Sequence, residues 1–199
     1  MITVVTVYYE PYDGVPQFSR CYTPEWVDKL YRGVARFYHH PFRFVCLTDR
    51  DDYQFQESIE IQQLKDRAWN RACMEGLGVK ADRIVFMGLD TIITGDLDHI
   101  FEYNGLLTVP RDVYRKNHAT NSVVLCPPRP DLVDVSGVTD MTVLDSVPHD
   151  WLDDLFPGQI VSYKAHVRIN GVGDARIVYF HGEPKPHQLM EPWIKEYWR

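Results

Sequence analysis

Asp90 is the residue whose type and place in the sequence most directly suggest chemistry on a ligand. It follows residues 84–87 (IVFM), a continuous apolar run typical of a strand buried on both faces of a mostly parallel sheet. Open α/β sheets bind their ligands at the carboxyl ends of such strands. An acid after a strand is more often an ordinary turn residue, so other residues must support a site here.

A second candidate segment lies late in the sequence, at residues 180–186 (FHGEPKP). Two of its side chains could act on a ligand, the imidazole of His181 and the ammonium group of Lys185. A lone histidine in an apolar strand is more often a core residue with satisfied hydrogen bonds. The glycine, proline and lysine neighbours of His181 are equally consistent with a functional site.

The elements that must position these residues alternate between strands and helices in the first half of the chain. Apolar and β-branched runs predict strands over residues 2–8, 42–47, 59–61, 84–87, 91–94, 106–109, 123–126, 160–163 and 176–180. Helical spacing and capping residues predict helices over residues 24–39, from Asp66 to Gly76 or Gly78, and over 139–147, 148–156 and 191–198. This order predicts one α/β domain whose sheet is parallel in its first half.

Composition and charge exclude several classes of protein. The 199 residues carry a formal net charge of −7, which disfavours nucleic acid as a partner because phosphate binding needs a basic face. An anionic ligand is still possible where local cations or a metal offset that field. No apolar stretch approaches the length of a membrane span and the first residues lack a basic signal-peptide head, so we expect a cytoplasmic protein. The four separated cysteines predict free thiols rather than disulfides or a zinc site.

Six separated segments resemble, in the same order, nucleotide-sugar glycosyltransferases with the GT-A fold. The similarity is greatest to bacterial and viral enzymes related to glycosyltransferase family 8. The segments are residues 67–71 (RAWNR), 83–101 (RIVFMGLDTIITGDLDHIF), 121–122 (NS), 140–141 (DM), 155–164 (LFPGQIVSYK) and 180–186 (FHGEPKP). The resemblance spans about residues 2–198. It implies a single α/β domain with a Rossmann-like, mixed and mostly parallel sheet flanked by helices. Residues 1–101 would form the nucleotide-binding half and residues 102–199 the half that binds the acceptor and completes the metal site.

The resemblance also implies roles for ten residues. Asp90 and His181 would bind Mn²⁺ or Mg²⁺, because a carboxylate and an imidazole together suit these cations. The other residues would hold the donor: the base against Thr6, Tyr8 and Tyr9 with Asp49 at its edge, the diphosphate against Arg71 and Lys185, and the sugar, at the catalytic position, against Asn121 and Asp140.

Three residues depart from the pattern of these enzymes. Gly88 replaces the first aspartate of the Asp-x-Asp motif, Val123 replaces a glycine near the sugar, and Met141 replaces a glutamine. Our first hypothesis is a metal-dependent enzyme that moves a hexose-type sugar from a UDP- or GDP-sugar to a glycan or related hydroxyl acceptor. The alternative is a non-catalytic protein that binds nucleotide sugars or glycans on the same scaffold. A nucleotide-dependent oxidoreductase is disfavoured, because Gly171-Val172-Gly173 lacks the third glycine and the strand–turn–helix context.

Overall fold

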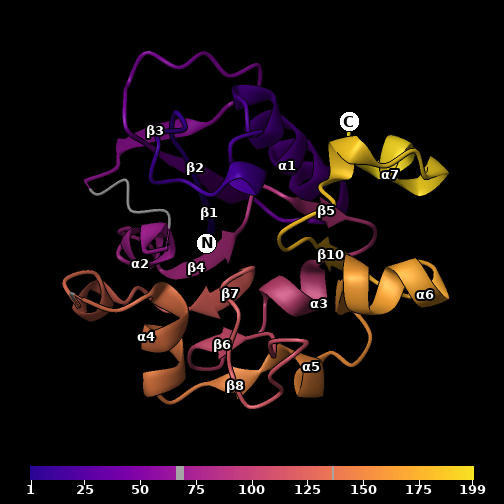
Figure 1. Ribbon diagram of the computed structural model, residues 1–199. Coiled ribbons are helices and arrows are strands. Elements are labelled where there is room, and N and C mark those ends of the chain that lie inside the picture. Colours follow the sequence, from indigo (N-terminus) through magenta and orange to yellow (C-terminus); the bar gives the residue numbers. More distant parts are fainter. Residues whose placement is uncertain (66–69, 136) are drawn as a thin grey trace.

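The computed structural model describes residues 1–65, 70–135 and 137–199, and its main feature is a seven-stranded sheet (Figure 1). Across the sheet the strands follow the order β3-β2-β1-β4-β7-β6-β8. The strands are β1 (Ile2–Tyr8), β2 (Phe42–Thr48), β3 (Glu60–Gln63), β4 (Arg83–Met87), β6 (Thr108–Val109), β7 (Val123–Cys126) and β8 (Asp150–Trp151). The first four strands of the chain run parallel, and β7 is antiparallel to both of its neighbours. The sheet is therefore mixed and mostly parallel, as the sequence predicts.

The residues of β1 show why this strand lies inside the sheet. Neighbouring side chains of a strand point to opposite faces. Val4 joins the core on one face and Val5 joins the core on the other, and neither side chain is exposed. An apolar run with no polar alternation can satisfy both faces only when both are covered.

Helices and a smaller sheet supply that cover. Figure 1 shows α2 and α4 on one face of the main sheet, and α1 with the small sheet β5-β10-β9 on the other. The remaining elements are α1 (Pro24–Phe37), α2 (Ala72–Leu77), β5 (Thr91–Ile93), α3 (Asp98–Phe101), α4 (Asp140–Ser146), α5 (Leu152–Leu155), β9 (Ile160–Ser162), α6 (Arg168–Asn170), β10 (Ile177–Tyr179) and α7 (Pro192–Tyr197). Single 3₁₀ turns lie at Gln17–Ser19, Pro130–Leu132 and Pro186–Gln188, and a π-helical turn lies at Tyr163–Val167.

The small sheet joins the middle of the chain to its end. β10 pairs antiparallel with β5, and the backbone N–H of Phe180 donates a hydrogen bond of 3.1 Å to the carbonyl oxygen of Asp90. The two segments that the sequence analysis selected are therefore neighbours in space, although about ninety residues separate them.

Two sequence predictions of local structure are wrong. Residues 148–156, predicted as one helix, form the short strand β8 followed by the single helical turn α5, because Trp151 pairs with Val109 at the edge of the main sheet. Tyr163, predicted as the end of a strand, begins a π-helical turn instead, and the chain stays helical to Asn170, where the sequence analysis predicts no helix. The predicted helix cap at Asp66 and the nearby Trp69 lie outside the described residues.

Two predictions about the whole chain can also be compared with the structure. All four cysteines are free, and three of them are buried, as expected. Among the described residues, no helix combines the length and apolarity that crossing a bilayer requires.

Candidate functional site

A pocket of about 380 Å³ opens at the carboxyl ends of β1 and β4. Its walls come from both halves of the chain, and eight of the ten residues selected from the sequence line it. These eight are Thr6, Tyr8, Tyr9, Asp90, Asn121, Asp140, His181 and Lys185. Their gathering in one place follows from the strand ends and from the β5–β10 pairing, which carry them to the same edge of the fold.

The other two selected residues, Asp49 and Arg71, do not line the pocket. Asp49 accepts a hydrogen bond of 2.9 Å from the hydroxyl of Tyr53, whose ring packs against that of Tyr8. Arg71 donates to the carbonyl oxygen of Val133 at 3.1 Å, so its guanidinium group supports a neighbouring loop. Neither residue is therefore part of the pocket lining.

A buried ion pair closes one end of the pocket. The ammonium group of Lys185 contacts Oδ2 of Asp90, and the two side chains are only 3% and 12% exposed. The hydroxyl of Tyr22 donates to the same carboxylate oxygen at 3.0 Å and accepts from Lys185 Nζ at 2.8 Å. Burial and the Asp90 carboxylate raise the pKa of Tyr22 well above its usual value, so this hydroxyl keeps its proton. The three groups form one connected network.

His181 occupies the next position along this wall as a neutral imidazole. Its Nε2 lies 2.9 Å from the hydroxyl of Ser162. Burial, followed by the nearby ammonium group of Lys164, lowers the pKa of His181. An imidazole must be neutral to bind a metal ion.

Lys164 places a second ammonium group beside the site. Its Nζ lies 3.3 Å from the position that a Cβ atom at residue 182 would occupy. Gly182 has a φ of +59°, a conformation that favours glycine. Burial and the charge of Lys185 lower the pKa of Lys164. Two lysines thus approach the turn that follows β10, and together they create local positive charge in an acidic protein.

The side chains present fit a divalent cation in type, but the set is short of one carboxylate. Asp90 and the neutral His181 are suitable ligands for Mn²⁺ or Mg²⁺. Oδ2 of Asp90 is bonded to Lys185 and Tyr22, so a cation would bind there only after Lys185 moves to another anion. The missing carboxylate is the one at position 88, where the Asp-x-Asp pattern has its first aspartate and this chain has Gly88.

Asp140 and Asn121 form another part of the pocket wall. Thr139 caps α4, and Asp140, the first residue of that helix, accepts hydrogen bonds from Asn121 Nδ2 at 2.5 Å and from the N–H of Met141 at 2.8 Å. Burial raises the pKa of Asp140 to about 6, and the Asn121 hydrogen bond opposes that rise. The carboxyl group is held in one orientation and can accept a hydrogen bond from a hydroxyl group in the pocket.

Comparison with known proteins supports the architecture. No protein-family model and no curated protein matches the sequence. Among solved structures, the galactosyltransferase LgtC, crystallised with donor and acceptor sugar analogs, is similar with a TM-score of 0.61 at 10% identity, covering 92% of this chain and 88% of LgtC. This chain has a GT-A glycosyltransferase fold.

Two other GT-A structures are longer than this chain. The glycosyltransferase GlyE of Streptococcus pneumoniae TIGR4 has a TM-score of 0.61 and 16% identity, and the match covers 95% of this chain but 56% of GlyE. The bifunctional glycosyltransferase WbbM has a TM-score of 0.64 and 10% identity, with 93% of this chain and 46% of WbbM covered. The chain thus spans about half the length of each, and at these identities the likeness shows the fold alone.

The three departures from the GT-A sequence pattern are not equivalent in the structure. Gly88 and Met141 line the pocket. Val123 lies in β7 opposite Met87, is fully buried, and packs into the core instead. The pocket wall therefore differs from the expected one at Gly88 and Met141, and the change at Val123 is one of core packing.

The raised pKa of Asp140 predicts a pH dependence of stability. Because the folded-state value, about 6, lies above the usual 3.8, the folded state holds more protons between these pH values. The free energy of unfolding should therefore fall as pH rises through about 4 to 6, by on the order of 3 kcal/mol, and stay level above. Asp140→Asn should lack this decline. Urea unfolding of both proteins between pH 4 and 7.5 measures the difference.

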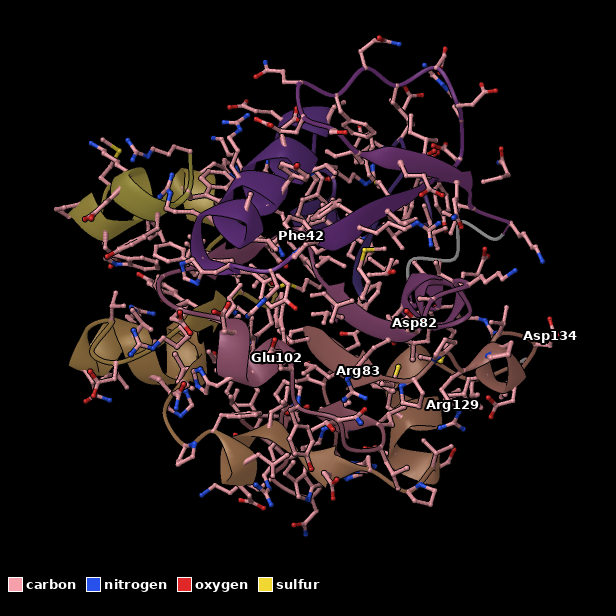
Figure 2. The ribbon with its side chains drawn as sticks, turned by 180° about the vertical axis from the view of Figure 1, so that it is seen from behind. Phe42, Asp82, Arg83, Glu102, Arg129 and Asp134 are labelled. Atoms are coloured by element: carbon pink, nitrogen blue, oxygen red, sulfur yellow. The ribbon has the colours of Figure 1, made fainter. Side chains whose placement is uncertain are left out.

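A matched variant controls for the general effect of removing a carboxylate. Asp134 is exposed, does not line the pocket, and is labelled in Figure 2. Asp134→Asn should keep the wild-type slope. If Asp140→Asn also keeps it, Asp140 titrates normally and the argument from burial is wrong.

Proposed function

We propose that this chain is a glycosyltransferase that moves a sugar from a UDP- or GDP-sugar to a hydroxyl group of a glycan or related acceptor. The observation that carries the proposal is the pocket itself, whose wall includes the ammonium group of Lys185, with Lys164 beside the neighbouring Gly182, and the oriented carboxyl group of Asp140. The GT-A fold adds support, because LgtC has the same fold and was crystallised with donor and acceptor sugar analogs. In this proposal residues 1–101 bind the nucleotide and residues 102–199 complete the site. A cytoplasmic location stays a prediction.

Lys185 and Lys164 would bind the diphosphate of the donor. A nucleoside diphosphate is an anion, and the protein as a whole carries a net charge of −7, so binding depends on local positive charge. Lys185 is held in the pocket wall by Asp90 and Tyr22. The side chain of Lys164 reaches Gly182, in the turn that follows β10. Each ammonium group can donate a charge-assisted hydrogen bond to a phosphate oxygen.

Asp90 and His181 would hold Mn²⁺ or Mg²⁺. When bound, such a cation neutralises the charge that builds on the departing diphosphate. The chain's own part would be to free Asp90, because a bound diphosphate would attract the ammonium group of Lys185 away from the carboxylate. His181 stays neutral and oriented by Ser162.

In another part of the pocket wall, Asp140 would accept a hydrogen bond from a hydroxyl of the sugar. Asn121 fixes the direction of the carboxyl group, and the N–H of Met141 holds its second oxygen. The transfer would break the bond between the sugar and the diphosphate, which would leave with the bonding electrons, and form a bond from the sugar to the acceptor oxygen, whose proton would pass to the departing diphosphate or to solvent.

A second candidate function is ligand binding without catalysis. Gly88 and Met141 both line the pocket, and both replace residues that the GT-A pattern uses near the donor. Incubation with a panel of UDP- and GDP-sugars separates the two candidates: release of the nucleoside diphosphate supports the enzyme, and binding without release supports the alternative.

The metal-dependent site predicts a specific thermal shift. UDP or GDP at about one hundred times its dissociation constant should stabilise the folded protein by about 2.7 kcal/mol, or about 5–10 °C in Tm for a chain of this size. The shift should be larger with Mn²⁺ than with EDTA, and smaller in Asp90→Asn and His181→Ala. Asp134→Asn should respond as wild type does. Equal shifts with and without Mn²⁺ would contradict the metal site, and no shift with any nucleotide would contradict the proposed function.

A further inference from the structure

We propose that His39, Asp96 and Asp98, with His40 as a fourth ligand, form a surface site for one divalent metal ion of the zinc class. The first three residues each bring a ligand atom within 4.8 Å of the other two. His39 lies in the loop between α1 and β2, Asp96 lies in the loop between β5 and α3, and Asp98 is the first residue of α3. The site is separate from the pocket and does not depend on the proposed function.

The distances from the histidine nitrogens to the carboxylate oxygens are close to those between the ligands of one metal ion. His39 Nδ1 lies 3.1 Å from Asp98 Oδ2 and 3.4 Å from Asp96 Oδ2, and His40 Nε2 lies 3.6 Å from Asp98 Oδ2. In a tetrahedral site with metal–ligand bonds of about 2.0–2.2 Å, neighbouring ligand atoms are about 3.3–3.6 Å apart. His39, Asp96 and Asp98 therefore already lie near the spacing that one cation needs, and His40, which is outside that group of three, would have to turn toward them to become the fourth ligand.

Each carboxylate is oriented through its other oxygen. Oδ1 of Asp98 accepts a hydrogen bond of 2.9 Å from the backbone N–H of His39. Oδ1 of Asp96 accepts one of 3.1 Å from the N–H of Asp98 and lies 3.6 Å from the imidazole of His99. Such contacts fix metal-binding carboxylates in place and leave one oxygen for the metal.

The two loops are also joined directly. The backbone N–H of Leu97 donates a hydrogen bond of 2.8 Å to the carbonyl oxygen of Phe37. Leu97 is fully buried, so this point is anchored in the core. Because the backbones on both sides are already fixed, a metal ion would not have to order a loose segment before binding.

The charges around the cluster favour a cation. Within residues 1–65, 70–135 and 137–199, the ion-pair partners of Asp96, Asp98 and Glu102 are histidines. The carboxylates of Asp96 and Asp98 lie close together and repel one another, and a divalent cation between them would offset that repulsion. Two imidazoles with two carboxylates suit Zn²⁺, Co²⁺ or Ni²⁺ better than Mg²⁺ or Ca²⁺, which prefer oxygen ligands alone.

The cluster lies at the opposite end of the sheet from the pocket. His39 and His40 come just before the amino end of β2, whereas the pocket lies at the carboxyl ends of the parallel neighbours β1 and β4. Figure 2, which looks from behind, labels Phe42 and Glu102, the two residues that flank this region on β2 and after α3. The side chains of His39 and Asp96 are 60% and 47% exposed, so a cation reaches them from solvent.

Calorimetry with ZnCl₂ on the metal-free protein tests the proposal. We expect one saturable site, a rise in Tm that EDTA reverses, and a tetrahedral absorption spectrum when Co²⁺ replaces Zn²⁺. His39→Ala and Asp98→Asn should each weaken Zn²⁺ binding by about tenfold or more. In Asp98→Asn the side-chain amide oxygen can still accept the hydrogen bond from His39 N–H, so the loop should keep its conformation.

Two control variants make the result specific. His166→Ala removes an exposed histidine elsewhere and should bind Zn²⁺ as wild type does. His181→Ala removes the pocket imidazole and should also leave this binding unchanged. The proposal is overturned if Zn²⁺ binding survives in both His39→Ala and Asp98→Asn, or if it is lost only in His181→Ala. Failure here would leave the nucleotide experiments, and so the proposed function, unaffected.

Discussion

Lys185→Met is expected to strengthen the binding of Mn²⁺ alone and to weaken the binding of UDP or GDP. In the wild type the ammonium group of Lys185 contacts the carboxylate that would bind the metal. Removing the ammonium group frees Asp90 Oδ2 and leaves the largely buried carboxylate of Asp90 without its cationic partner. A metal cation can take the place of that ammonium group. Nucleotide binding loses a charge-assisted hydrogen bond of about 1.5–3 kcal/mol, or roughly ten- to hundredfold in affinity.

Calorimetry with Mn²⁺ and UDP, added separately and together, gives both affinities. The variant should also be less stable in EDTA, and Mn²⁺ should restore more stability to it than to the wild type, since a ligand that binds only the folded state stabilises it. Lys195→Met, which removes an exposed lysine, serves as the control. If Lys185→Met binds Mn²⁺ no more tightly than wild type does, the lysine is not competing with a metal at Asp90.

Gly88→Asp is expected to tighten the binding of Mn²⁺ and nucleotide by roughly tenfold, the effect of restoring one charge-assisted contact. Gly88 is not among the glycines with positive φ, so its backbone conformation is open to other residues. A side chain there would first meet Asp90 Oδ1, at 3.2 Å, which is the end of a side chain that can move. Gly88 and Asp90 both line the pocket, so both carboxylates can reach one cation there.

Without a cation the same substitution should destabilise the protein, because it places two carboxylates close together. Gly88→Asn has the same shape without the charge and should give neither effect. Calorimetry and thermal unfolding in Mn²⁺ and in EDTA separate these outcomes. If Gly88→Asp binds Mn²⁺ and nucleotide no better than Gly88→Asn does, this loop does not hold the ligand as proposed.

The sequence predicted the fold correctly where the elements are long and their apolar pattern is continuous. The runs that became β1 and β4 are buried on both faces, and the periodic face of α1 (Trp26, Leu30 and Val34) enters the core. Short elements could not be predicted in this way. β8 has two residues and exists because Trp151 pairs with Val109, a contact that no local pattern encodes.

The candidate site shows the same division. Asp90, His181 and Lys185 could be selected because each stands in a distinctive segment after an apolar run. Tyr22 and Lys164 could not, because their importance comes from contacts with residues far away in sequence. Arg71 was assigned to the diphosphate, and a sequence motif could not reveal that its guanidinium group donates to loop carbonyls instead.

The position of β10 in the small sheet has a consequence for the order in which the protein is made. β10 is the middle strand of that sheet but the last strand of the chain, and Lys185 meets Asp90 across a separation of 95 residues. As the chain emerges from a ribosome, β1, β2 and β4 can pair early, whereas the basic end of the pocket appears only after residues 177–185 arrive. Contacts across so long a loop form late, because closing the loop costs chain entropy before any contact is gained. Newly made molecules should therefore acquire their parallel sheet well before they can hold an anion.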